Sequence, residues 1–191
     1  MRFDKGHKFA TRDRIIKAAS MRFRRDGIAA SGIAGVMEDA GLTHGGFYAH
    51  FSSKEDLVGQ ATNAAIEMTN HRLERLTAQD SSWLTQRITH YLSASHRDHP
   101  ATGCAVAALV AELGRHGAQT RAIFTEKLAA IFAAYAAHLP PETPETLRGE
   151  KAIGIFAVML GGLQLARAVA DPDLSNKILD AASQAAHRLA A

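Results

Sequence analysis

The sequence of 191 residues predicts an all-α protein, with a small N-terminal three-helix domain followed by a larger helical domain. Apolar residues recur at three- and four-residue spacing along most of the chain, which is the period of an amphipathic helix. No segment combines sustained alternation of apolar and polar residues with turn residues, so no strand is expected. Hydrophobic residues make up 47% of the chain, which is enough for a real core at this length.

The first helix is predicted over residues 12–25. Ile15, Ala19 and Phe23 recur at i, i+4 and i+8 and form one apolar stripe. Gly27 follows this stripe, and glycine readily adopts the left-handed conformation that ends a helix. The helix can therefore pack on the elements predicted next, which are too short to bury a core alone.

Two short helices joined by a glycine turn follow. The first has apolar residues at i, i+3, i+4 and i+7, namely Ile33, Val36, Met37 and Ala40. Ser31 is placed to cap its start, and Gly41 is placed to end it. Thr43 can cap the second helix, whose two phenylalanines are expected in the core. This order is the helix-turn-helix pattern, and a second helix of that size fits a DNA major groove.

Many residues of this region stand in a fixed register: Ile33, Ala40-Gly41-Leu42-Thr43, Gly45, Phe47-Tyr48, His50-Phe51 and Lys54. In this register the region resembles the DNA-binding domain of the TetR/AcrR family of one-component transcriptional repressors. The resemblance covers about the first 60 residues, and beyond them it is only architectural. It implies two sets of DNA-contacting residues: Thr43, His44, Gly45 and Tyr48 close to DNA, and Ser31, His50 and Lys54 near its backbone.

Two positions depart from the commonest pattern of that family, which has a long basic residue at 44 and a side chain at 46. His44 is only partly charged near neutral pH, and Gly46 costs a helix interior about 1 kcal/mol relative to alanine. Base recognition is therefore expected to depend on Thr43, Tyr48 and close approach of the backbone.

Charge is distributed unevenly along the chain. Residues 1–54 hold ten Lys and Arg against five acidic residues, a net +5, whereas the remaining chain holds twelve against fourteen, a net −2. A basic first domain is expected to meet a polyanion. Residues 1–11 have no helical period and are expected to be either a mobile basic arm along the DNA or a disordered start.

A long helix from Lys54 to Leu76 is predicted to begin at a capping box of Ser52 and Glu55. It would connect the DNA-binding domain, residues 1–54, to a ligand-binding and dimerisation domain, residues 55–191. Further helices are predicted over residues 83–98, 103–115, 118–139, 145–170 and 174–190. Three prolines at 140, 141 and 144 force the break between the third and fourth of these.

The second domain is expected to bind a small-molecule effector and to form a homodimer. The effector candidates are apolar or aromatic side chains on inner helix faces, namely Met68, His71, Trp83, Tyr91, Cys104, Phe124 and Phe156. The dimer candidates combine large apolar residues with glycines that allow close helix approach, namely Ile155, Val158, Gly161, Gly162, Leu165 and Val169.

Three alternatives remain open. Cys104 follows Gly103 at a predicted helix start, which can stabilise a thiolate, and some members of the TetR/AcrR family use a cysteine in a similar context to sense electrophiles. The competing interpretation is a small core residue. The second alternative is a helical binding module without DNA affinity. The third is an enzyme on a helical bundle, although no phosphate loop or nucleophile elbow is present.

The interpretation favoured by these features is a cytoplasmic homodimer that represses transcription until a small molecule releases it from double-stranded operator DNA. A single cysteine fits a reducing cytoplasm. His96 and His99 near Cys104 do not form a zinc motif, so neither metal nor cofactor is expected. The N-terminus lacks the apolar run of a secretory signal, and the stretch from Ala152 to Ala166 is short for a membrane span, so no membrane partner is expected.

Overall fold

A computed structural model describes the backbone of residues 5–77 and 82–191, and the side chains of residues 6–68 and 82–191. Every regular element in these ranges is a helix, which confirms the predicted all-α class. In chain order they are α1 (Lys5–Asp26), α2 (Ile33–Asp39), η1 (His44–Ala49), α3 (Lys54–Thr77), α4 (Trp83–Tyr91), α5 (Ala94–Asp98), η2 (Pro100–Thr102), α6 (Ala105–Leu113), α7 (Ala118–Ala137), α8 (Glu145–Ala168) and α9 (Pro172–Ala190).

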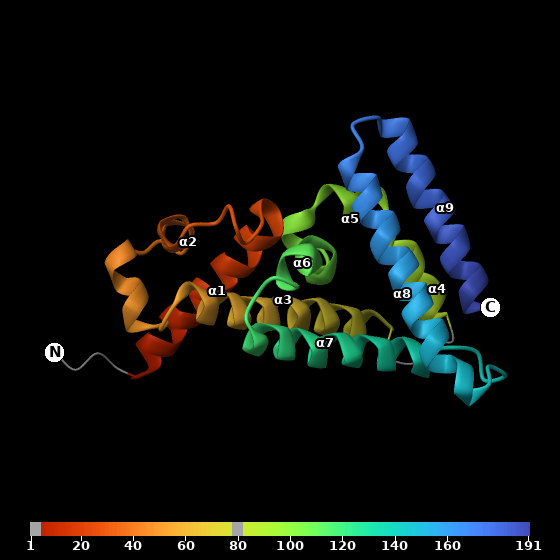
Figure 1. Cartoon of the computed structure of the whole chain (residues 1–191), viewed down its shortest axis with the longest axis horizontal. Helices are drawn as coiled ribbons and strands as arrows, with labels where there is room; N and C mark the ends of the chain where they lie inside the picture. The colour runs from red at the N-terminus through yellow and green to blue at the C-terminus, as the bar shows by residue number, and fades with distance from the viewer. Residues whose placement is uncertain (1–4, 78–81) are drawn as a thin grey trace.

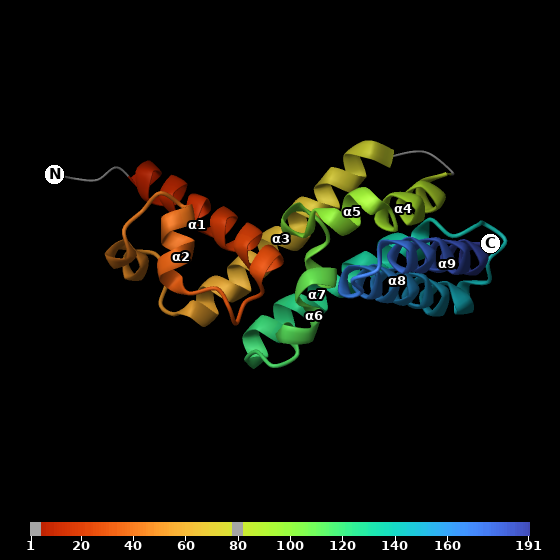
Figure 2. The same cartoon turned by 90° about the horizontal axis from the view of Figure 1, so that it is seen from above.

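The molecule is elongated, with α1, α2 and η1 at one end and α8 and α9 at the other (Figure 1). We call the first group the head and α4–α9 the body. Helix α3 runs from the head into the body, with α7 lying along it. Seen from above, the two ends of the chain lie at opposite ends of the molecule (Figure 2). A change in the direction of α3 would therefore move the head relative to the body.

The head is built as the sequence predicts from two glycine-terminated helices and a short third element. Gly27 and Gly41 have φ angles of +87° and +65°, the left-handed region that ends a helix at little cost for glycine. Arg22 of α1 fixes α2 by donating to the Gly35 carbonyl at 3.0 Å and to Asp39 Oδ2 at 2.9 Å. The turn between α2 and η1 is thus held both locally and by α1.

The apolar core of the head extends beyond the head itself. Its centre is formed by Ile15, Phe23, Met37, Phe47 and Phe51, all at most 2% exposed. The same cluster also includes residues of two other helices, namely Leu57, Val58 and Ala61 of α3 and Leu109 and Leu113 of α6. The two parts therefore share buried surface, which mechanically couples them.

Four local predictions were wrong. Helix α1 begins at Lys5, so residues 5–11 are helical and not an arm, while residues 1–4 lie outside the described range. Ser31 does not cap α2, because its hydroxyl donates to the Gly27 carbonyl at 2.6 Å. The capping box is shifted by one residue: Ser53 Oγ accepts from the Asp56 N–H at 3.0 Å, and Asp56 Oδ2 accepts from the Ser52 N–H at 3.0 Å.

The fourth difference is a break in the helix predicted over residues 83–98. Helix α4 ends at Tyr91, and Ser93 caps α5 by accepting from the His96 N–H at 3.1 Å. Serine in an extended conformation satisfies the free N–H groups of a new helix start, so the chain turns here. This turn carries α5 and the start of α6 toward the head.

Helices α8 and α9 form an antiparallel pair at the far end of the body. Helix α8 has 24 residues and is long and apolar enough to cross a membrane by length and composition alone. Its inner face, however, lies in the core of the body through Phe156, Met159 and Leu163, each at most 2% exposed. Burial within the body therefore explains the apolar composition of this face.

Candidate nucleic-acid interface and the junction behind it

The recognition element is a 3-10 helix and not the expected α-helix. Its Gly46 N–H donates to the Thr43 carbonyl at 3.1 Å, and the His50 N–H donates to the Phe47 carbonyl at 2.9 Å, both with i to i−3 spacing. Two consecutive glycines lower the stability of an α-helix in so short a segment, which accounts for the tighter form. Thr43 stands at the N-cap without a side-chain capping bond.

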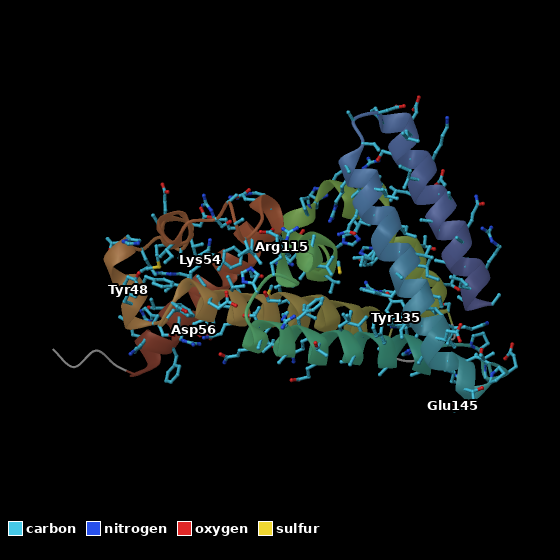
Figure 3. The ribbon with its side chains drawn as sticks, in the orientation of Figure 1. Tyr48, Lys54, Asp56, Arg115, Tyr135 and Glu145 are labelled. Carbon is cyan, nitrogen blue, oxygen red and sulfur yellow. The ribbon has the colours of Figure 1, made fainter. Side chains whose placement is uncertain are left out.

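Four of the predicted DNA-contacting residues lie on one exposed surface, namely Thr43, His44, Gly45 and Tyr48. Tyr48 is 67% exposed and lies at the tip of the head, with its ring edge against Phe47 at a centroid distance of 5.1 Å (Figure 3). Phe47 and Phe51 are stacked and buried, as expected for core residues. The buried rings anchor a short segment that presents its polar groups outward.

Ser31 and Lys54 are not free for direct contact with a ligand at this surface. Ser31 is fully buried, because its hydroxyl closes the turn after α1. Lys54 is half-buried, and its Nζ donates to the Ile28 carbonyl at 2.8 Å. Lys54 therefore connects the start of α3 to the loop before α2. One N–H of its ammonium group is already used in this bond.

The N-terminal half of α1 places basic residues of the expected arm beside this surface, but in a helix. Arg12 Nε donates to the His50 carbonyl at 3.4 Å, and its guanidinium lies 4.9 Å from the centroid of Phe51. Burial, and then the charges of Lys8 and Arg12, lower the pKa of His50. Lys8 and Arg12 are four residues apart on one helix face. This spacing would have predicted that both lie on the same side of α1 if residues 5–11 had been expected to be helical.

Glu55 joins the start of α3 to the start of α7. Its carboxylate accepts from the Thr120 hydroxyl at 2.6 Å and from the Gly117 N–H at 3.1 Å, and it lies 2.8 Å from His116 Nδ1. The bonds from Thr120 and then His116 lower the pKa of Glu55. Gly117 is the N-cap of α7, so this carboxylate supplies the cap that glycine lacks.

Three further hydrogen bonds, made by two charged side chains, join head and body. Glu112 of α6 accepts from the backbone N–H groups of Ile28 at 3.0 Å and Ala29 at 2.7 Å. Arg24 of α1 donates to the Gly103 carbonyl at 3.0 Å, and only 5% of this arginine is exposed. Together with Glu55, these contacts fix the angle between the recognition element and the body.

Comparison with known proteins agrees with this architecture. The model for bacterial regulatory proteins of the tetR family matches residues 15–61, from the middle of α1 to the second turn of α3. Residues 15–61 therefore carry the DNA-binding segment of the tetR family. The HTH-type transcriptional regulator TtgR of Pseudomonas putida is 37% identical over 70 residues, covering 37% of this chain and 33% of that protein. The uncharacterised HTH-type regulator YfiR of Bacillus subtilis is 28% identical over 88 residues, covering 46% and 42%.

The chain matches less than half the length of these curated relatives, but TetR-family structures align along nearly all of it. The TetR regulator of Chloroflexus aurantiacus has a TM-score of 0.77 at 23% identity, covering 96% of this chain and 94% of that one. NemR of E. coli, in its reduced form, has a TM-score of 0.75 at 16% identity, covering 94% and 96%. At these identities the likeness establishes the fold of the chain alone.

The predicted effector residues do not line one common cavity. Trp83, Tyr91 and Phe156 are at most 7% exposed and fill the core of the body, where Tyr91 lies 6.1 Å from Phe156. Phe124 is packed between the two cores, and the His71 side chain lies outside the described residues. Of the set, Met68 and Cys104 line a shared cavity between head and body.

His96 holds the backbone beside Cys104. Its Nδ1 lies 2.7 Å from the Tyr91 carbonyl, and its Nε2 accepts from the Cys104 N–H at 2.9 Å. An Nδ1–H tautomer satisfies both contacts, and burial lowers the pKa of His96 to about 4. Both ring nitrogens are thus engaged by the backbone. No group of three or more potential metal ligands occurs among the described residues.

The predicted dimer residues separate onto two faces of α8. Ile155 and Gly162 face inward, and a Cβ on Gly162 would collide with Ala182 of α9, so their role is packing within one protomer. Leu165 is 60% exposed, and a Cβ on Gly161 would meet open space. Val158 and Val169 are half-buried. The prediction confused inner and outer faces because apolar residues occur on both.

Proposed function

We infer that this protein is a DNA-binding transcriptional regulator that acts from the cytoplasm as a repressor. The observation that carries this proposal is the exposed Thr43–Tyr48 surface, which lies inside the segment matched by the family model. Lys8 and Arg12 flank it and supply positive charge for DNA phosphates. The DNA-binding part is residues 1–54, although its core is completed by α3 and α6.

The test is selection of bound duplexes from a random pool, followed by titration of the selected operator at several salt concentrations. Replacement of Tyr48 by Ala should weaken operator binding without changing stability, because this side chain is exposed. Arg12→Gln should reduce the salt dependence of the affinity by about one ion. Lys177→Gln, on the exposed surface of α9, is the matched charge control. A chain that selects no duplex would favour a helical binding module without DNA affinity.

The functional unit proposed is a homodimer formed through the outer face of α8. Ile153, Gly161 and Leu165 lie on this face at four- or eight-residue spacing, and Ile153 and Leu165 are 49% and 60% exposed. A two-fold pair would bury this stripe against its own copy and carry two heads to successive major grooves. A mass of one chain in solution at micromolar concentration would refute it.

Release from DNA is proposed to follow binding of a small molecule behind the head. A ligand that binds one head–body angle better than another shifts the population toward that angle. The cavity lined by Met68 and Cys104 is the site proposed, because it is bordered by both α1 and α4. Operator affinity measured with and without a bound ligand tests this coupling.

A thiol sensor at Cys104 is the second candidate. Cys104 is the N-cap of α6 and borders the cavity, which favours this function, but only 4% of the residue is exposed. An added group would overpack the site at a cost of about 1–3 kcal/mol. The rate at which an alkylating reagent modifies Cys104 in the folded protein tests the sensor function. A thiol that reacts only after denaturation belongs to the core.

A further inference from the structure

The cavity between head and body has a volume of about 560 Å³. Helix α1 contributes Lys17, Met21 and Arg24 to its lining, α3 contributes Met68, α4 contributes Arg87, and the start of α6 contributes Cys104. Among the described residues that line it, none is Asp or Glu. The cavity therefore combines cations from two parts of the molecule with apolar side chains.

Arg87 is the most informative of these residues. It is 7% exposed, its Nε donates to the Tyr135 hydroxyl at 3.0 Å, and its guanidinium lies 5.3 Å from the centroid of Tyr91. Its two terminal nitrogens have no acceptor among the described residues, and no carboxylate there pairs with it. A buried guanidinium without a counter-charge is costly, and its free N–H groups are suited to an anion.

Arg24 approaches the same cavity from the head. It is 5% exposed and donates to the Ser20 carbonyl at 2.9 Å, the Ser20 hydroxyl at 3.1 Å and the Gly103 carbonyl at 3.0 Å. All these acceptors are neutral, so the charge of Arg24 is not compensated by a described carboxylate. Lys17 lies two helical turns before Arg24, at the exposed edge of the cavity.

A second cation-lined cavity, between α1 and α8, does not offer the same chemistry. There Arg97 is paired with Asp98 at 2.7 Å, and Arg167 donates to the carbonyls of Arg97 and His96 at 3.0 and 2.6 Å. Arg97 and Arg167 thus already bind groups of the protein itself. Among the described arginines that line the two cavities, Arg87 is the one with both terminal nitrogens lacking an acceptor.

We propose that the cavity at Arg87 binds an organic anion, a carboxylate or phosphate carried on an apolar body. The anionic group would lie between Arg87 of the body and Arg24 and Lys17 of the head, and the apolar body would rest on Met21 and Met68. This inference rests on the proposed function only where it concerns regulation of DNA binding. There the anion would connect α1 to α4 and select one head–body angle. Binding itself requires no DNA.

The probes are octanoate, octyl phosphate and the neutral octanamide, each below its micelle-forming concentration. Binding is followed by the thermal midpoint of the full chain and by the emission of Trp83. This is the single tryptophan of the chain, and its ring lies 5.4 Å from Tyr135, the partner of Arg87. At least one anion should bind tenfold more tightly than octanamide and raise the midpoint by several degrees. The preferred anion distinguishes carboxylate from phosphate recognition.

Arg87→Met and Lys17→Met should each weaken the preferred anion at least tenfold and leave octanamide unchanged. Lys17 is exposed, so its variant remains informative if Arg87→Met does not fold. Arg14→Met removes the same charge from an exposed position of α1 outside the cavity and should bind as the parent does. Equal affinity for acid and amide, no binding of either anion, or unchanged affinity in a folded Arg87 or Lys17 variant would overturn the proposal.

Operator binding is measured separately on the same preparations, without any anion. A chain that binds an anion but no operator DNA would refute the proposed function and leave the anion inference standing. Operator binding by a chain that takes up neither anion would refute this inference alone.

Discussion

Removal of the Glu112 carboxylate should loosen the head from the body. In Glu112→Ala the N–H groups of Ile28 and Ala29 lose acceptors at 3.0 and 2.7 Å. A hydrogen bond to a charged group contributes about 1.5–3 kcal/mol, and leaving a half-buried donor unpaired adds to the loss. Ala29 is exposed and can bind water instead, so most of the effect should come from Ile28.

We therefore expect a loss of about 2 kcal/mol in the free energy of unfolding. For a chain of this length that corresponds to a fall of roughly 4–8 °C in the thermal midpoint. Glu112→Gln keeps neutral acceptor capacity and should lose about half as much. Glu142→Ala, an exposed carboxylate in the loop before α8, is the control and should change little.

Denaturant unfolding and amide hydrogen exchange measure the two consequences. The Ile28 amide should lose protection in Glu112→Ala more than amides of α8 do, because only the junction is opened locally. Wild-type protection at Ile28, or an unfolding midpoint equal to that of the Glu142 control, would show that these bonds do not hold the head.

Four other outcomes follow from the structure. His96 has a folded pKa of about 4 against an ordinary value of 6.5, so the unfolded chain binds more protons between these values, and stability should be lost as pH falls from 6.5 toward 4. At pH 5 this loss is about 2 kcal/mol relative to pH 7, and His96→Gln should flatten the pH profile of chemical unfolding. Leu165→Glu should convert the proposed dimer to folded monomers in sedimentation. Gly162→Ala should instead destabilise the protomer, because the added methyl group collides with Ala182, and a lower thermal midpoint would show this. Lys54→Met should lower both stability and operator affinity, because Nζ binds the Ile28 carbonyl; a variant with unchanged thermal midpoint would contradict that role.

The all-α class and the helix-turn-helix could be predicted because their signals are local. Apolar periodicity marked α3 and α7 nearly to the residue, and glycine marked the ends of α1 and α2 through the left-handed angles observed at Gly27 and Gly41. The exposed residues Thr43, His44 and Tyr48 could be assigned because the neighbouring phenylalanines at 47 and 51 were expected to be buried. These features depend on interactions within a few residues.

The sequence by itself determined the helices and the surface offered by the recognition element, whereas the tertiary structure decided which distant charges meet. Glu112 binds a backbone amide 84 residues away, and Arg24 binds a carbonyl 79 residues away. Ile155 and Leu165 have similar apolar character, yet one is buried and the other is exposed. The cavity that brings Arg87 together with Lys17 and Arg24 also arises only when α1 and α4 are placed around it. Helical period and capping act along the chain, but the partner of a charge depends on how helices pack, and that is set by the core as a whole.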